Sequence, residues 1–368
     1  MNQEWIKQFW SRIESKLSVV APQIETPFPY TTDGQGNFVS YRDETWWTNG
    51  FWAGIMWMAY QETRKECYKD IAIASEEALD QAFLSFDGLH HDVGFMWLPS
   101  AVAHYRIDGN EKSRSRGMHA ATLLAGRFNC MGEFIRAWNR DQLGWVIIDS
   151  MMNIPLLHWA YKETGDPRFY HIAVKHADTV MKNFVREDGS VHHIVELDPL
   201  TGQVVSIPIG QGYASGSSWS RGQAWAIYGF TLSYQYTGDF KYLEVAKHAA
   251  EYFIEHLSED GVPVVDFKAP DEPVMKDTAA AAVAVSGMIE LMTLVDGTEK
   301  ECYEASVVKL LKGLEKNCDF ELDKQSILQN GTERYHGTTG FHIPIIYGDY
   351  YLIEALLKLK SLERGKIQ

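Results

Sequence analysis

Apolar residues recur every three to four positions over most of the chain, in stretches separated by short polar segments. This spacing places the apolar side chains on one face of a helix. The pattern predicts about twelve helices. They fall near residues 4–19, 49–63, 67–84, 94–107, 111–128, 150–163, 167–185, 219–236, 240–257, 278–295, 300–316 and 343–361.

A short motif recurs where one predicted helix ends and the next begins. Residues 161–173 (YKETGDPRFYHIA) resemble residues 234–246 (YQYTGDFKYLEVA), and residues 60–72 match them without the glycine. Thr-Gly-Asp supplies a glycine that ends one helix and an aspartate that caps the next. Six such hairpins, with tight turns at one end and long loops at the other, predict an all-α fold, an (α/α)6 barrel. The alternative is an open helical solenoid, whose repeat spacing should be more uniform.

One long loop departs from the helical pattern. Residues 189–210 alternate apolar and polar side chains in places and contain the turn sequence DPLTG. We therefore expect a small β-hairpin within this loop. No linker divides the chain, so residues 1–368 are expected to form a single domain.

Composition and charge narrow the choice of partner and compartment. Hydrophobic residues make up 45% of the chain and charged residues 23%, which is ordinary for a globular protein. A net charge of −15 without a basic tract argues against binding to nucleic acid or to an anionic membrane. The N-terminal segment is amphipathic rather than a secretory signal, and no apolar run is long enough to span a bilayer. Four scattered cysteines are expected to be free thiols, which completes the prediction of a cytoplasmic protein.

Aromatic residues are abundant and gather in short motifs. The chain has 12 Trp, 18 Tyr and 17 Phe residues, and many of the tryptophans lie in loops rather than at helical spacing. Aromatic rings stack on the C–H faces of sugars, so this pattern favours a carbohydrate cleft. A large aromatic core is the alternative explanation.

Two aspartates stand in motifs that suit catalysis. Asp92 lies in HHDVGF, and Asp149 lies in VIIDSMMN, where an apolar stretch meets a predicted helix. In a sugar cleft they offer the paired carboxyl groups of a glycosidase, one protonated and one ionised. The structural alternatives are a helix cap for Asp149 and a turn or cap for Asp92.

The histidines invite comparison with a metal site, but their spacing is wrong for one. His90 and His91 are adjacent, as are His192 and His193, and a helical zinc site uses positions i and i+4. Adjacent side chains of an extended segment point in opposite directions, so at most one of each pair should face the cleft. We therefore expect hydrogen bonds from His91 and His193 to sugar. No metal and no cofactor are expected, since dinucleotide-binding and P-loop motifs are also missing from the sequence.

One arginine is placed to recognise an anion. Arg221 lies between Trp219 and Trp225, in a polar loop that leads into a predicted helix. Its planar fork of donors suits a carboxylate, which an acidic protein needs if its substrate is acidic. The alternative is a surface arginine stacked on Trp225.

Taken in order, HHDVGF, VIIDSMMN and SSWSRGQAW resemble the unsaturated glucuronyl hydrolases of glycoside hydrolase family 88, from Trp46 to about Leu359. The resemblance implies an (α/α)6 barrel that acts on the 4,5-unsaturated uronic acid left by polysaccharide lyases. It implies that Asp149 is the general acid and base and that Asp92 is the second cleft aspartate. Implied sugar contacts are Trp47, His91, Trp138, His193, Gln211, Trp219, Arg221, Trp225 and Tyr335.

The expected substrate is a small acidic oligosaccharide. The residues of the motifs GLHHDVGFMW and QGYASGSSWSRGQAW resemble those of family members that process glycosaminoglycan fragments, which favours disaccharides such as unsaturated chondroitin or hyaluronan. Three alternatives stay open: an unsaturated rhamnogalacturonyl hydrolase, a sugar 2-epimerase on the same barrel, and a toroid that binds carbohydrate without catalysis.

Overall fold

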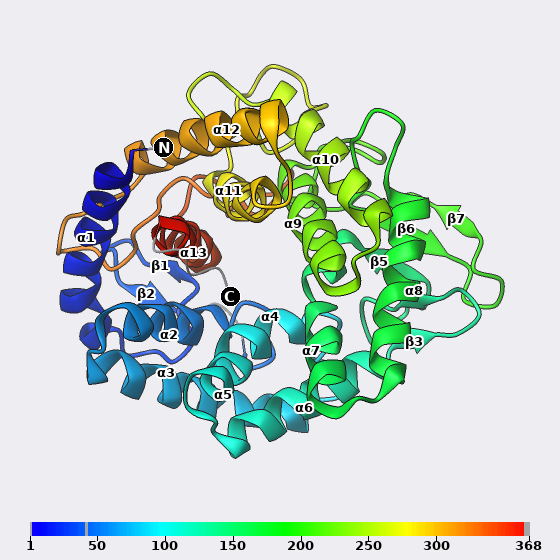
Figure 1. Ribbon diagram of the computed structural model, residues 1–368, viewed down its shortest axis with the longest axis horizontal. Coiled ribbons are helices and arrows are strands. Elements are labelled where there is room, and N and C mark those ends of the chain that lie inside the picture. The colour runs from blue at the N-terminus through cyan, green and yellow to red at the C-terminus, as the bar shows by residue number, and fades with distance from the viewer. Residues whose placement is uncertain (1, 41–42, 364–368) are drawn as a thin grey trace.

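The computed structural model describes residues 2–40 and 43–363, in which the helices form a closed double ring (Figure 1). Each predicted helix has a counterpart, so the all-α (α/α)6 barrel is confirmed. The helices are α1 (Gln3–Val20), α2 (Phe51–Thr63), α3 (Glu66–Ala78), α4 (Val93–Trp97), α5 (Ala103–Asp108), α6 (Glu111–Ala125), α7 (Pro155–Thr164), α8 (Pro167–Phe184), α9 (Ser220–Thr237), α10 (Phe240–Glu255), α11 (Thr278–Met292), α12 (Gly297–Lys316) and α13 (Ile346–Glu363).

The inner and outer helices differ in how they bury apolar residues. Inner helix α11 is buried along nearly its whole length, because other helices surround it. Outer helix α8 buries one stripe, which includes Phe169, Ala173, Val180 and Phe184. The stripe follows the helical repeat and faces the inner ring. Alternation of these two kinds of helix along the chain produces the two layers.

The repeated turn motif acts as the sequence predicts. Gly165 ends α7 in the left-handed region at φ 69°, and the carboxylate of Asp166 accepts from a backbone N–H of α8. Gly238 and Asp239 do the same between α9 and α10, with φ 72° at the glycine. In the copy without glycine, Arg64 takes the left-handed conformation at φ 60°.

Three of the predicted helices are not regular α-helices throughout. The helix expected at 67–84 is α3 followed by a 3-10 helix at Leu79–Leu84. The helix expected at 94–107 consists of α4, a π-helical turn at Leu98–Val102 and α5. Pro99 lies in that turn, and proline cannot donate the backbone hydrogen bond of a regular helix. The helix expected from residue 150 begins as a 3-10 turn at Ile148–Met152, and α7 starts only at Pro155.

The β-hairpin expected within 189–210 is present. Strands β6 (Ile194–Leu197) and β7 (Val204–Ser206) pair antiparallel, and β5 (Trp145–Ile147) adds to the other edge of β6. Two further small sheets are formed by β1 (Thr31–Thr32) with β2 (Phe38–Val39) and by β3 (Phe128–Asn129) with β4 (Phe134–Ile135).

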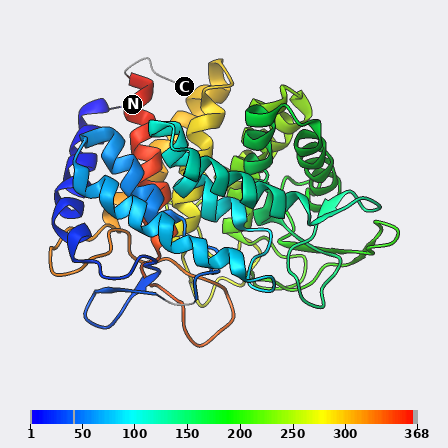
Figure 2. The same cartoon turned by 90° about the horizontal axis from the view of Figure 1, so that it is seen from below.

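The long loops gather at one end of the ring, opposite the end where α1 begins and α13 ends (Figure 2). Inner helices α2, α4 and α9 start at this loop-rich end. Residues just before their first turns therefore converge near the axis of the ring. Within residues 2–40 and 43–363, no helix combines the length and the apolar character that a bilayer crossing requires.

Candidate active site

A cavity of about 330 Å³ opens where the loops meet the starts of the inner helices. We call it the active-site cavity. It is lined by Tyr30, Trp46, Trp47, His90, His91, Asp92, Trp138, Trp145, Ile147, Asp149, His193, Ile194, Ile209, Gly210, Gln211, Glu333, Arg334 and Tyr347. Both predicted catalytic aspartates thus face one space, together with four tryptophans.

Asp92 stands immediately before α4, yet its side chain does not cap that helix. Its Oδ1 instead accepts a hydrogen bond from Nδ2 of Asn153 at 2.9 Å. Nε2 of His91 lies 3.4 Å from Oδ1, and Nδ1 of His90 lies 3.3 Å from Oδ2. The carboxylate is therefore hydrogen-bonded to Asn153, with two histidine rings beside it, rather than used for helix capping.

Asp149 is not a helix cap either. It lies inside the 3-10 turn Ile148–Met152, whose capping position is occupied by Ile147. Its buried Oδ1 has no hydrogen-bond partner among the described residues. Nε2 of His193 is 4.0 Å from that oxygen. Asp149 thus presents an unsatisfied carboxyl oxygen in the cavity, as a residue that exchanges a proton with substrate should.

Asn153 joins the two aspartates. Its Nδ2 donates to Asp92 Oδ1 and, at 3.0 Å, to the backbone carbonyl of Asp149. Its Oδ1 accepts from the backbone N–H of Phe95 at 2.8 Å. Gly94 permits this approach, because a Cβ there would lie 2.5 Å from Cα of Asn153. Sequence reasoning missed Asn153, although its position four residues after Asp149 in VIIDSMMN was a usable signal.

Burial dominates the charge state of the pair. It raises the pKa of Asp149 to about 7, against the opposing charge of Arg221. Burial also raises the pKa of Asp92 well above its usual range, and the charge of Asp149 raises it further. The hydrogen bond from Asn153 and the charge of Arg127 act in the other direction on Asp92. Two neighbouring buried carboxyl groups resist double ionisation, so the pair retains one proton near neutral pH.

The histidine pairs follow the extended-chain rule in only one case. His193 lines the cavity, while Nδ1 of His192 lies 3.3 Å from Nη1 of Arg186, so this pair divides as predicted. His90 and His91 both line the cavity and both approach Asp92, which the rule did not predict. The reason is that they lie in the turn leading into α4, where successive side chains do not alternate.

His90 and His91, together with Asp92, form a group of side chains that could hold a metal ion. Ligand atoms of His90, His91 and Asp92 all lie within 4.8 Å of one another. The two histidine nitrogens lie 3.3 and 3.4 Å from the Asp92 carboxylate oxygens, and Oδ1 already accepts a hydrogen bond from Asn153. We keep the prediction that no metal is needed. Exhaustive chelation should then leave turnover unchanged, and recovery of lost activity by zinc or calcium would contradict this.

The protonation of His193 follows from its neighbours. Its Nδ1 accepts from the backbone N–H of Gln211 at 2.9 Å, so the neutral ring carries its proton on Nε2, facing Asp149. Burial lowers the pKa of His193 to about 3, and the charge of Arg221 adds to the effect. The Gln211 side chain donates to the Glu333 carbonyl at 2.6 Å. His193 is thus a neutral donor in the active-site cavity.

The predicted tryptophans divide into two sets. Trp47 and Trp138 line the cavity. Trp219 and Trp225 do not line it and are buried at the start of α9. The Trp219 ring packs against His193 with centroids 4.2 Å apart, and Trp225 packs against Phe95 at 5.1 Å. They support residues of the site from behind, since an inner helix is covered on all sides.

Arg221 also lies behind the cavity rather than in its lining. The side chain is 1% exposed, and its Nη1 donates to Asp277 at 2.5 Å and to the Thr332 carbonyl at 2.8 Å. Its Nη2 donates to the Glu333 carbonyl at 2.7 Å. The guanidinium carbon lies 4.6 Å from the ring centroid of Trp219, not over Trp225. The predicted fork is therefore taken by the protein itself, and Arg221 acts on Asp149 through its charge.

The cation on the rim is Arg334. It is exposed and is the only Lys or Arg side chain among the described residues that line the cavity. The predicted contact Tyr335 is half-buried next to it, outside the lining, and its backbone N–H donates to the Gln211 carbonyl at 2.7 Å. The RYHG motif at residues 334–337 indicated that this loop belongs to the site, but the motif alone does not determine which of its residues faces the substrate.

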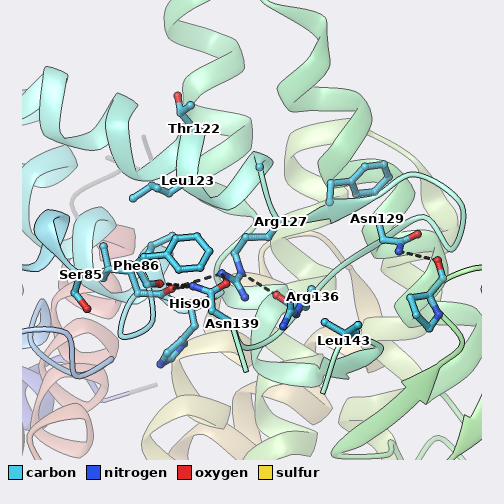
Figure 3. A pocket seen from close by; sticks show the side chains of 15 residues that line it. Ser85, Phe86, His90, Thr122, Leu123, Arg127, Asn129, Arg136, Asn139 and Leu143 are labelled. Carbon is cyan, nitrogen blue, oxygen red and sulfur yellow. Dashed lines mark hydrogen bonds between the residues drawn. The ribbon is translucent and has the colours of Figure 1, made fainter. Parts of the chain in front are cut away.

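A larger cavity of about 540 Å³ lies behind His90 (Figure 3). It contains neither catalytic candidate and shares only His90 with the active-site cavity. Nη1 of Arg127 donates to Oδ1 of Asn139 at 2.5 Å and Nη2 donates to the Ala137 carbonyl at 3.0 Å, while Nδ2 of Asn139 donates to the Leu89 carbonyl at 2.7 Å. These hydrogen bonds connect the loop that contains residues 90–92 with the segment that contains Trp138. We call them the Arg127–Asn139 bracket.

Comparison with known proteins places the chain among carbohydrate-active enzymes. Residues 26–352 match the family model described as Glycosyl Hydrolase Family 88. The chain is 36% identical over 356 residues to the unsaturated chondroitin disaccharide hydrolase of Streptococcus agalactiae serotype III (strain NEM316), covering 91% of this chain and 85% of the relative.

Solved structures agree. The unsaturated glucuronyl hydrolase of Bacillus sp. GL1, described as responsible for the degradation of glycosaminoglycan, superposes with a TM-score of 0.90 at 33% identity, covering 97% of each chain. A mutant of the Streptococcus agalactiae unsaturated glucuronyl hydrolase, complexed with dGlcA-GalNAc6S, gives a TM-score of 0.84 at 31% identity, covering 97% of this chain and 92% of that one. By sequence and fold together, this chain belongs to Glycosyl Hydrolase Family 88 and is a glycoside hydrolase.

Proposed function

We propose that the enzyme hydrates the C4=C5 double bond of an unsaturated glucuronic acid at the non-reducing end of lyase-generated oligosaccharides, and so releases the partner sugar. The observation that carries the proposal is the pair Asp92 and Asp149, which line one cavity beside four tryptophans and whose pKa values are both raised by desolvation. The names of the relatives, which act on unsaturated glucuronyl and chondroitin disaccharide substrates, support glycosaminoglycan fragments as the substrate class.

The shared proton is assigned to Asp149. Asp92 accepts a hydrogen bond from Asn153, and such a donor stabilises a carboxylate. Oδ1 of Asp149 has no such partner among the described residues, which suits the protonated form. Asp149 is therefore the acid and Asp92 the anion.

The reaction follows from this assignment. The C4=C5 bond beside the ring oxygen is a vinyl ether, whose π electrons take the proton of Asp149 to form a C4–H bond. Positive charge develops at C5 and the ring oxygen, where ionised Asp92 stabilises it. Asp149, now ionised, takes a proton from water as the water oxygen bonds to C5. The resulting hemiketal opens and releases the partner sugar.

The substrate contacts divide as the geometry does. We propose that Trp47, His91, Trp138, His193 and Gln211 touch the sugar and that Arg334 binds its carboxylate. Trp219, Arg221, Trp225 and Tyr335 hold these residues in place from behind.

Isotope labelling tests the chemistry directly. Turnover in D₂O should place deuterium at C4 of the uronic acid product, and turnover in ¹⁸O-water should place the label at C5. A conventional glycosidase with the same carboxylates would protonate the bridging oxygen and deliver water to C1. Label at C1 without deuterium at C4 would overturn the proposed hydration.

Loss of the enoate ultraviolet absorbance of an unsaturated chondroitin disaccharide separates the rival substrates. Turnover supports the proposal, whereas turnover of a pectin-derived unsaturated disaccharide alone indicates a rhamnogalacturonyl hydrolase. Isomerisation of an N-acylhexosamine indicates an epimerase, and binding without turnover indicates a toroid that does not catalyse.

We also propose that the chain acts as one domain in the cytoplasm, without nucleic-acid or membrane partners. One apolar core cluster includes residues from α1 through α13, which supports a single domain. Cys67, Cys130 and Cys302 are free and exposed, which suits a reducing compartment. The net charge of −15 opposes binding to polyanions.

A further inference from the structure

A third cavity of about 490 Å³ adjoins the active-site cavity. The two share Trp46, His90 and Trp138, whereas Asp149 and His193 line only the active-site cavity. We call the third cavity the Arg140 cavity, after the arginine in its lining. The two spaces therefore adjoin each other at Trp46, His90 and Trp138, and the Arg140 cavity lies on the side away from Asp149.

The active-site cavity alone is small for an oligosaccharide. Its volume of about 330 Å³ lies near the lower end of the roughly 300–1,000 Å³ usual for ligand pockets. A disaccharide places its unsaturated ring against Asp149 and its second ring near Trp138. Any further sugar must leave this cavity, and the Arg140 cavity is the space that adjoins it beyond Trp138.

The lining of the Arg140 cavity suits a charged sugar. Arg140 is exposed, and its side chain makes no hydrogen bond or ion pair with any residue in the ranges 2–40 and 43–363. Gln142 adds a half-buried amide beside it. The lining has two acidic groups. The carboxylate of Asp43 accepts a hydrogen bond from the Thr45 hydroxyl at 2.6 Å, and Asp87 is exposed to solvent, where its charge is screened.

The spacing of charge along the substrate identifies the ligand. Acidic polysaccharides built from alternating uronic acid and hexosamine carry a carboxylate on every second sugar. The sugar after the partner of the unsaturated residue is then another uronic acid. We propose that the Arg140 cavity binds this third sugar and that Arg140 binds its carboxylate. The inference rests on the proposed function and makes unsaturated tetrasaccharides better substrates than disaccharides.

The test compares kcat/KM for the unsaturated, unsulfated chondroitin tetrasaccharide and disaccharide. Wild-type enzyme should prefer the tetrasaccharide by roughly fivefold, as an accessible charge-assisted contact allows. Arg140→Gln should remove most of this preference, and 0.5 M salt should reduce it in the wild type, since an exposed ion pair is screened. Arg168→Gln, which removes an exposed arginine at the start of α8, is the matched control and should keep the preference.

Equal kcat/KM for the two substrates in the wild type, or an unchanged preference in Arg140→Gln, would overturn the inference. Should that variant fold poorly, a tetrasaccharide whose internal uronic acid is reduced to the neutral hexose replaces it. The wild type should then lose its preference, and a retained preference would refute the role of charge. Failure of the proposed function itself looks different, because neither the disaccharide nor the tetrasaccharide would lose its ultraviolet absorbance.

Discussion

Individual side chains in this enzyme carry functions that their sequence neighbours do not reveal. Asp92 and Asp149 both occupy positions where an aspartate commonly caps a helix, yet neither side chain does so. Each lines the same cavity, where desolvation raises the pKa of both. The carboxyl oxygen of Asp149 that lacks a hydrogen-bond partner among the described residues costs stability, and such a group is typical of a functional site.

Asp149→Asn should lower kcat by about 100-fold or more while KM changes little, because an amide keeps the shape but cannot transfer the proton. Disaccharide turnover followed by ultraviolet absorbance measures this. Asp239→Asn is the matched control, since asparagine caps α10 as well as aspartate does. A kcat above about a tenth of the wild-type value would exclude Asp149 as the acid.

Asp92→Asn should also lower kcat strongly, because the developing positive charge loses its counter-charge. The same assay, run over a range of disaccharide concentrations, separates kcat from KM. An unchanged kcat with a raised KM would make Asp92 a binding residue instead.

Arg334→Gln should raise KM for the acid substrate roughly tenfold and leave KM for its methyl ester nearly unchanged, because only the acid offers a charged fork partner. Equal losses on the acid and the ester in Arg334→Gln would show that another group binds the carboxylate.

Arg221→Lys should instead lower Tm, since one ammonium group cannot hydrogen-bond Asp277 and two backbone carbonyls together.

At the scale of elements, the active site is built from connections between loops and helix starts. Asn153, which follows a 3-10 turn, holds the residues at the start of α4, and the Arg127–Asn139 bracket holds the same loop from its outer side. The inner helices pack beneath these loops, and α9 and α11 are buried over most of their length. The loops are thereby attached to buried helices, which suit the precise placement of catalytic groups.

Asn153→Ala should move the acid limb of the kcat/KM profile to higher pH. The hydrogen bond from Asn153 lowers the pKa of Asp92, so its loss raises that pKa and protonates Asp92 at a higher pH. Asp239→Asn, which changes a helix cap outside the cavity lining, is the control and should leave the limb in place. An acid limb that stays fixed in Asn153→Ala would mean that Asp92 need not be ionised.

At the scale of the whole molecule, the closed double ring gives stability that can tolerate buried charge at its centre. A carboxyl group whose folded pKa lies above its unfolded value binds more protons when folded, so stability falls as pH rises between the two values. Asp149, with a folded pKa of about 7, imposes such a loss between roughly pH 4 and pH 7.

Thermal melts should therefore show that Asp149→Asn is more stable than the wild type at pH 8, by a few degrees in Tm. The advantage should shrink toward pH 4, where the wild-type carboxyl group is protonated in both states. The control Asp239→Asn should show the opposite trend, because hydrogen bonds from the backbone and side chain of Lys241 lower the pKa of Asp239 in the folded protein. A difference that does not vary with pH would show that the folded protein does not hold Asp149 protonated.

Sequence alone determined the elements of this protein, because helices and caps depend on contacts within a few residues. Periodicity located the helices, Thr-Gly-Asp located turns such as Gly165–Asp166, and three motifs indicated the family and the two aspartates. Its errors also have a local cause: Pro99 interrupts one helix, and the extended-chain rule failed where His90 and His91 lie in a turn.

Only the tertiary structure decided how those residues are shared between binding and support. Arg221 finds Asp277 and the carbonyl of Glu333, 56 and 112 residues away, and so leaves the rim to Arg334. Asn153 reaches Asp92 across 61 residues and thereby sets the geometry of the catalytic pair. Such pairings arise when ring closure brings distant loops together, and no local pattern of residues encodes which partner will be in reach.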